Sequence, residues 1–160
     1  MRTPGRRRRQ AGATRTTLAP TWLNLYGARK RFNDGTTGKA MCLAYDFHGV
    51  SGYAVARRKL PMDHPGNFEY SLQVRGDAPA NNLEFKLPDA SGENVWWVNR
   101  RDFEFSPNWT NVVLKKRHIS FAWGPLGGGE LKQSAAIEFA SRFGRSAPQW
   151  FSMPEIVGRM

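Results

Sequence analysis

Apolar and polar residues alternate along most of the chain from about Lys39 onward. The clearest case is FEYSLQVR (68–75), in which every second residue is apolar. A period of two is typical of β-strands, because successive side chains point to opposite faces. The stretch 130–139 fits a helix, and its alternation at Ile137 and Phe139 suits a strand as well. The pattern predicts strands over 39–47, 53–60, 68–75, 83–87, 95–105, 111–119 and 135–140, with a last short strand near Trp150.

Turn-forming residues separate these segments. The sequence PDASGEN (88–94) lies between two predicted strands and favours a hairpin of 83–87 with 95–105. About seven or eight short strands at intervals of about 10–15 residues predict an all-β protein, an antiparallel β-sandwich with jelly-roll or Greek-key connections. We expect a disordered basic arm over 1–31, the β-sandwich over 32–150, and a C-terminal tail over 151–160 that could be truncated.

The segment GENVWWVNRRDFEF (92–105) does not fit simple alternation. Its last phenylalanines are typical of core positions, and strict alternation would then bury Trp97 and expose Trp96. The same rule would also bury Asn99 and Arg101. A β-bulge in or after the tryptophan pair removes this conflict, because one extra residue reverses the faces of the strand. We therefore expect one indole in the core and the other on the open face of a sheet.

An open indole beside amide and guanidinium groups is suited to sugars. The C–H face of a pyranose stacks on the ring, and the polar groups pair with its hydroxyls. Alternatively, the tryptophan pair only packs the core and the polar residues only face water, and this alternative stays open at this point. The sequence predicts a ligand-binding set of Gln73, Lys86, Trp96, Trp97, Asn99, Arg101, Lys115 and Trp123.

The positive charge is concentrated at one end of the chain. The net charge is +11, but nine of the 24 Lys and Arg residues lie in the first 31 positions, where there are no acids. The remaining 15 basic residues are nearly balanced by 13 acids. The arm is either a leader without selected function or a segment that contacts nucleic acid or anionic lipid.

Two rival functions use the same strands. One is nucleic-acid or polyanion binding through a basic stripe beside the tryptophans, which the charge balance after Arg31 disfavours. The other is docking of the open face onto a neighbouring domain. The stripe would comprise Arg57, Arg58, Arg100, Arg101, Lys115, Lys116 and Arg117.

No pattern of catalysis, cofactor binding or membrane insertion is visible. The three histidines lack metal-ligand spacing, and any two acids on adjacent strands would resemble a glycosidase pair, so we expect no enzyme activity and no cofactor. A structural Ca²⁺ site at Asp34–Gly35 is a separate hypothesis. The single cysteine, Cys42, allows no intrachain disulfide. The chain has no apolar run of about 18 residues and no apolar segment of a secretory signal.

The residues also resemble a known family. LEFKLPDASGENVWWVNRRDFEFSPNW (83–109), VVLKKRHISFAWGP (112–125) and AAIEFA (135–140) resemble jelly-roll carbohydrate-binding modules at the N-terminal side of bacterial glycosidase-like and discoidin-type proteins. These modules are similar in fold to family 11 and galactose-binding-like modules, and the likeness covers about 38–140. The resemblance implies a non-catalytic, extracytoplasmic module that binds an oligo- or polysaccharide and holds a glycosidase domain near it.

Overall fold

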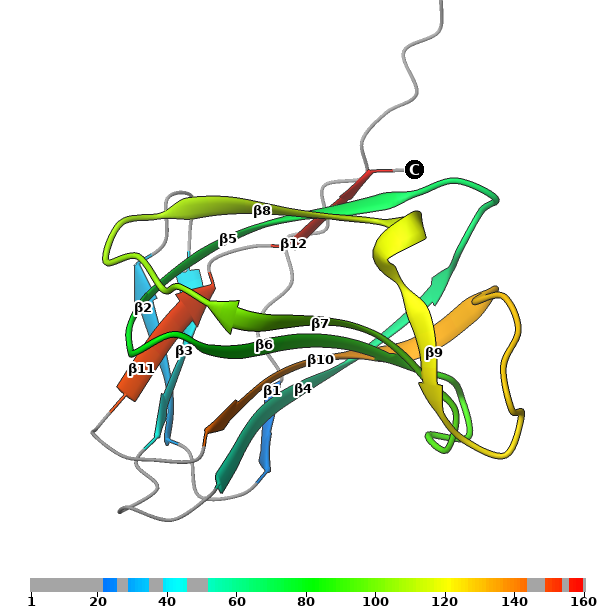
Figure 1. Cartoon of the computed structure of the whole chain (residues 1–160), viewed down its shortest axis with the longest axis horizontal. Helices are drawn as coiled ribbons and strands as arrows, with labels where there is room; N and C mark the ends of the chain where they lie inside the picture. The colour runs from blue at the N-terminus through cyan, green and yellow to red at the C-terminus, as the bar shows by residue number, and fades with distance from the viewer. Residues whose placement is uncertain are drawn as a thin grey trace, which may run out of the picture.

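The alternating segments form two β-sheets that face each other (Figure 1). The computed structural model describes residues 22–25, 29–34, 39–45, 52–143, 149–153 and 156–159. In this part of the chain the first sheet has the order β1 (Trp22–Leu25), β4 (Gly52–Asp63), β10 (Gln133–Phe143), β6 (Asn81–Pro88), β7 (Val95–Phe103) and β9 (Ser120–Trp123). All of its pairings are antiparallel.

The second sheet is also antiparallel. Its strand β5 pairs with β8 over residues 69–74, with β12 over residues 69–72 and with β11 over residues 75–77. The chain crosses from β8 to β9, and thus from the second sheet to the first, through the short 3₁₀ helix η1 (Lys116–His118). The strands of this sheet are β12 (Ile156–Arg159), β5 (Glu69–Asp77), β11 (Gln149–Met153), β3 (Lys39–Tyr45) and β2 (Arg29–Asp34), with β8 (Thr110–Lys115) on β5.

The predicted fold class is confirmed: the protein is an antiparallel β-sandwich. The hairpin of β6 and β7 is also confirmed. The predicted strand 111–119 is instead β8, η1 and part of β9, so its second half leaves one sheet for the other. Residues 22–25 and 29–31 belong to the expected disordered arm, but they form β1 and the start of β2. The expected tail similarly contains β12, and residues 1–21 lie outside the described part.

The core lies between the sheets and follows the pleat of the strands. Alternate residues of β5 and β6 point into it, and Phe85 and Phe139 pack together at a centroid distance of 5.2 Å. Each large apolar side chain buried here contributes about 1.5–3 kcal/mol. A cavity of about 10 Å³ between the sheets is lined by apolar side chains and Arg100, and it holds at most about one water molecule. The interior between the sheets thus leaves no room for a larger molecule in this cavity.

Two buried tyrosines connect the sheets. The hydroxyl of Tyr45 on β3 donates to Ser141 Oγ on β10 at 2.9 Å. The hydroxyl of Tyr70 on β5 lies 3.3 Å from His64 Nδ1, and His64 Nε2 lies 2.9 Å from Ser134 Oγ on β10. Burial lowers the pKa of His64, and the nearby Asp63 acts in the opposite direction. His64 is therefore held as a neutral bridge between the two layers.

Candidate functional site

Strand β7 places its two tryptophans on opposite faces. Trp96 is 5% exposed and packs edge-on against Phe121 at 5.3 Å, within the core. Trp97 is half-buried on the outer face, which we define as the face of the first sheet that points away from the second sheet. The expectation of one inward and one outward indole is confirmed. The prediction of Trp96 as a ligand residue is wrong, because its ring is enclosed by the core.

The predicted bulge lies four residues after the pair. Leu83 pairs with Arg100 and Asn81 with Phe103, so β7 has one residue more than β6 over this interval. Asp102 takes up the difference with a φ of 51°, a left-handed conformation that is uncommon outside glycine. The extra residue turns Phe103 towards the core, although Trp97 and Asn99 before it face outward.

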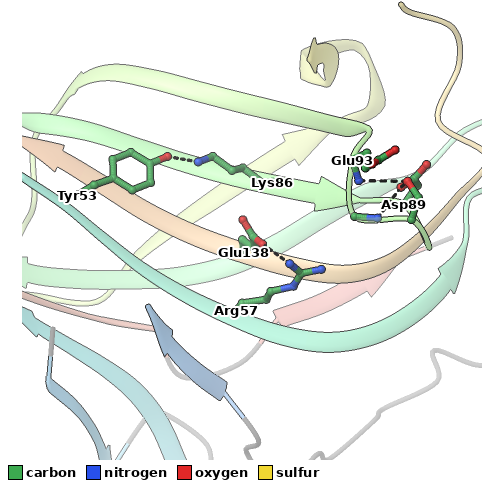
Figure 2. A network of polar contacts seen from close by, with 8 residues as sticks. Tyr53, Arg57, Lys86, Asp89, Glu93 and Glu138 are labelled. Atoms are coloured by element: carbon green, nitrogen blue, oxygen red, sulfur yellow. Dashed lines mark hydrogen bonds and ion pairs between the residues drawn. The ribbon is translucent and has the colours of Figure 1, made fainter. Parts of the chain in front are cut away.

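A row of charged and aromatic side chains crosses the outer face. Directly opposed residues of antiparallel strands have their side chains on the same face. The register therefore aligns Arg57 of β4, Glu138 of β10, Lys86 of β6 and Trp97 of β7. Arg57 Nη1 lies 3.3 Å from Glu138 Oε1 (Figure 2). The row alternates positive and negative groups and ends on an indole.

Lys86 of this row also belongs to a cluster of polar side chains on the same face, Tyr53, Glu84 and Lys86, which we call the polar floor. Lys86 Nζ lies 2.9 Å from Glu84 Oε2, and both side chains are only 5% exposed. The Tyr53 hydroxyl donates to Glu84 and accepts from Lys86, towards which it points in Figure 2. Burial lowers the pKa of Lys86 to about 8, and the Glu138 carboxylate opposes this shift. Lys86 is thus still a cation at neutral pH, and its charge is compensated within the floor.

Two indoles form a rim beside the floor. The rings of Trp97 and Trp123 meet edge to face at 5.7 Å, with an interplanar angle of 80°. Lys86 Nζ lies 5.3 Å from the centroid of the Trp123 ring. Trp123 is 46% exposed, and Leu126 in the following loop is 62% exposed. The rim therefore offers apolar ring surface next to charged and hydrogen-bonding groups.

Asn99 belongs to the same face, but two other predicted residues do not. Asn99 lies opposite Glu84, and the exposed Arg101 lies within the bulge. Gln73 on β5 and Lys115 on β8 belong to the second sheet, so grouping them with the indoles is wrong. Alternation separates inside from outside, but it does not tell which of two sheets a strand joins. As ligand contacts, the residues of the outer face stay predictions.

Sequence reasoning missed the contribution of β4 and β10. Tyr53, Arg57 and Glu138 all lie on the outer face, and none was in the predicted set. The alternation of residues within the segments 53–60 and 135–140 could have indicated which of their side chains share a face. The pairing of these strands with β6 was not, because it depends on contacts far apart in the sequence.

The basic residues do not form the single stripe of the polyanion hypothesis. Arg57 is paired with Glu138, whereas Arg100 points to the interior and donates to the Val113 carbonyl at 3.0 Å. Burial lowers the pKa of Arg58. Lys115 lies on the second sheet, and Lys116 is paired with Glu130. The positive charge is therefore divided among the first sheet, the second sheet and the interior.

Metal and membrane features are limited to the following observations. Gly35 and the side chain of Asp34 lie outside the described residues, so the Ca²⁺ hypothesis stays a prediction. No cluster of three or more potential His, Cys, Asp or Glu metal ligands occurs in the described part of the chain. Cys42 is a free, buried thiol. Among the same residues, no helix has the length and apolar character needed to cross a membrane.

Solved structures share this architecture. The family 11 carbohydrate-binding module of the cellulosomal cellulase Lic26A-Cel5E of Clostridium thermocellum matches with a TM-score of 0.66 and 16% identity over 88% of each chain. A family 11 module from the same organism, in complex with a β-1,3-1,4-mixed-linked tetrasaccharide, matches with a TM-score of 0.67 and 17% identity over 88% of this chain and 89% of that one. The chain has the β-sandwich fold of these modules.

The same fold also occurs within larger proteins. The structure of the glycoside hydrolase domain of Endo-D from Streptococcus pneumoniae R6 matches with a TM-score of 0.58 and 13% identity, over 86% of this chain but 21% of that one. No protein-family model matches the sequence, and no curated protein matches it. At these identities the likeness shows the fold, and the discoidin-type and galactose-binding-like parts of the resemblance stay predictions.

Proposed function

We propose that this chain is a non-catalytic module that binds an oligo- or polysaccharide on the outer face of its first sheet. The observation that carries the proposal is the Trp97–Trp123 rim beside the floor of Tyr53, Glu84 and Lys86. An indole with exposed surface covers the C–H face of a sugar ring, and nearby polar groups replace the water that the hydroxyls lose.

The state of Asn99 supports the same proposal. Its Oδ1 atom is buried and has no hydrogen-bond partner among the described residues. An unsatisfied buried acceptor costs about 1–3 kcal/mol. A sugar hydroxyl that reached this atom after a small side-chain rotation would recover part of that cost. Asn99 lies on the outer face directly opposite Glu84, within the surface that we assign to the ligand.

The fold supports a choice of first probe. The family 11 module of C. thermocellum was solved with a β-1,3-1,4-mixed-linked tetrasaccharide. We therefore choose a mixed-linked β-glucan as the first glycan to test. We infer that the module acts outside the cytoplasm and keeps a linked glycosidase domain near the substrate of that domain. Affinity is expected to be modest, because one small sheet face contributes few fully buried contacts.

The test is glucan binding by the full chain and by tryptophan variants, measured by calorimetry and intrinsic fluorescence. Trp97→Ala and Trp123→Ala are each expected to weaken binding about tenfold or more, since a rim indole behaves as a hot spot. Trp109→Ala is the matched control, because the Trp109 ring lies against Arg75 of the second sheet, 4.5 Å from its guanidinium carbon.

Salt and ligand range decide between the proposed function and its rivals. Glycan binding is expected to change little between about 0.05 and 0.5 M salt, whereas polyanion binding falls steeply. A glycan array extends the test to other sugars. The proposal is refuted if no glycan binds, or if both rim variants bind as well as the wild-type chain.

A further inference from the structure

The loop that follows Trp123 rests on the turn between β6 and β7. A Cβ added to Gly124 would lie 2.5 Å from Asn94 Oδ1 and 2.6 Å from both Asn94 Cα and the Glu93 carbonyl oxygen. Gly124 has a φ of 135°, which side-chain-bearing residues rarely adopt. The backbone after Trp123 is therefore in direct contact with the residue that precedes β7.

Asn94 joins this loop to the turn with both ends of its amide. Its Oδ1 accepts from the backbone N–H of Leu126 at 2.8 Å, and its Nδ2 donates to Asp89 Oδ2 at 2.7 Å. Asn94 is 9% exposed, so both hydrogen bonds are partly shielded from water. An alanine at this position would leave the Leu126 N–H without its acceptor and Asp89 without one of its donors.

Asp89 is in turn fixed by its own turn. Its Oδ1 accepts from Ser91 Oγ at 2.6 Å and from the Gly92 N–H at 2.9 Å. Desolvation raises the pKa of Asp89, but the hydrogen bonds from Ser91, Asn94 and Gly92 outweigh it and hold the pKa below its usual value. The anchor of Asn94 is thus an ionised, oriented carboxylate.

The other end of the same loop is also held by β7. Trp96 Nε1 donates to the Gly129 carbonyl at 3.0 Å. Asn94 and Trp96 therefore hold the loop 124–129 at Leu126 and at Gly129. Trp97 contacts the indole of Trp123, the residue directly before this loop. The sequence NVWW places an anchor, a core residue and a rim residue within four positions.

We propose that Asn94 is a positioning residue that holds Trp123 in its edge-to-face contact with Trp97 and so keeps the rim in the shape that a glycan needs. This inference rests on the proposed function for its binding consequence, but the indole geometry is measurable without any ligand. Preorganisation of this kind raises affinity because the loop loses less freedom on binding.

The first variant is Asn94→Ala in the full chain, with Asn111→Ala on the second sheet as the matched exposed control. Two indoles in close contact give a far-ultraviolet circular dichroism couplet, which reports the Trp97–Trp123 geometry. Asn94→Ala is expected to reduce this couplet and to weaken glucan binding about tenfold. In the Asn94→Ala background, Trp123→Ala should then cause little further loss, since both changes remove the same contact.

Two further variants distinguish a positioning role of Asn94 from a general loss of stability. Asn94→Asp places two carboxylates at hydrogen-bond distance and should reduce the couplet. The double variant Asp89→Asn/Asn94→Asp restores one donor and one acceptor in reversed order, and the new carboxylate at position 94 still accepts from the Leu126 N–H. We expect the couplet and the affinity to recover in this double variant.

The outcomes separate the two levels of inference. The positioning role is overturned if Asn94→Ala lowers the unfolding midpoint but leaves the couplet and the affinity unchanged, or if the swapped variant is no better than Asn94→Asp. If the wild-type chain binds no glycan, the proposed function fails, and the couplet still decides whether Asn94 positions Trp123.

Discussion

The Glu84–Lys86 pair makes a quantitative prediction, because it is a buried ion pair on the outer face of the first sheet. We expect Lys86→Met to lower the free energy of unfolding by about 3 kcal/mol, at the lower end of the range for breaking a buried pair. Both side chains are 5% exposed, and the pair distance is 2.9 Å. The pKa of Lys86 is about 8, so the side chain is mostly protonated at pH 7 and the variant removes a buried positive charge.

The double variant Glu84→Gln/Lys86→Met separates charge from packing. It removes both buried charges and nearly preserves volume, so it should recover most of the loss, as replacements of whole buried pairs do. Lys116→Met is the matched control. Lys116 pairs with Glu130, but these side chains are 31% and 53% exposed, so this change should leave stability nearly unchanged.

Urea unfolding at pH 7, followed by tryptophan fluorescence, measures all three variants. A constant m-value would show that the midpoint reports stability. The reasoning is refuted if Lys86→Met is no more destabilising than Lys116→Met. It is refuted equally if the double variant is as unstable as the single one, since the loss would then come from packing and not from an uncompensated charge.

Two further predictions concern the ends of the sandwich. Gly124→Ala should destabilise the chain by about 1–3 kcal/mol in urea unfolding, because its Cβ meets the Asn94 Cα and the Glu93 carbonyl oxygen. Gly127→Ala, which has open space around its Cβ, should cost less, and equal losses would contradict this. The lowered pKa of His64 means that the unfolded chain takes up a proton first, so stability should fall as pH decreases below about 6.5. The unfolding midpoint, measured at several pH values, should decrease less on acidification for His64→Gln than for the control His118→Gln. If the midpoints of His64→Gln and of the wild-type chain decrease in parallel, His64 is not the cause.

Local patterns were sufficient for most of the strands between β3 and β10 and for the hairpin that carries the candidate site. Alternation over 83–87 and turn chemistry at 88–94 act between near neighbours, so the sequence predicts them directly. The conflict within 92–105 also pointed to a bulge, and Asp102 provides it. The choice between Trp96 and Trp97 was not predictable, since it depended on where the extra residue lay.

The composition of the outer face required long-range information. Gln73 has the same polar alternation as Lys86, but β5 joins the second sheet. Tyr53 reaches Lys86 across 33 residues of sequence. The contact of Gly124 with Asn94 likewise joins two loops whose proximity only the tertiary fold sets. In each case the missing knowledge was which strands are neighbours.

The closed floor has a consequence for altering specificity. Although Tyr53, Glu84 and Lys86 lie on the face that we propose for the ligand, Glu84 and Lys86 are as inaccessible as the hydrophobic interior. Random libraries at Glu84 and Lys86 would mainly yield destabilised chains, whatever sugar is used for selection. Diversity placed at Trp97, Trp123 and the glycine-rich segment after it would instead sample new binding preferences on an intact scaffold.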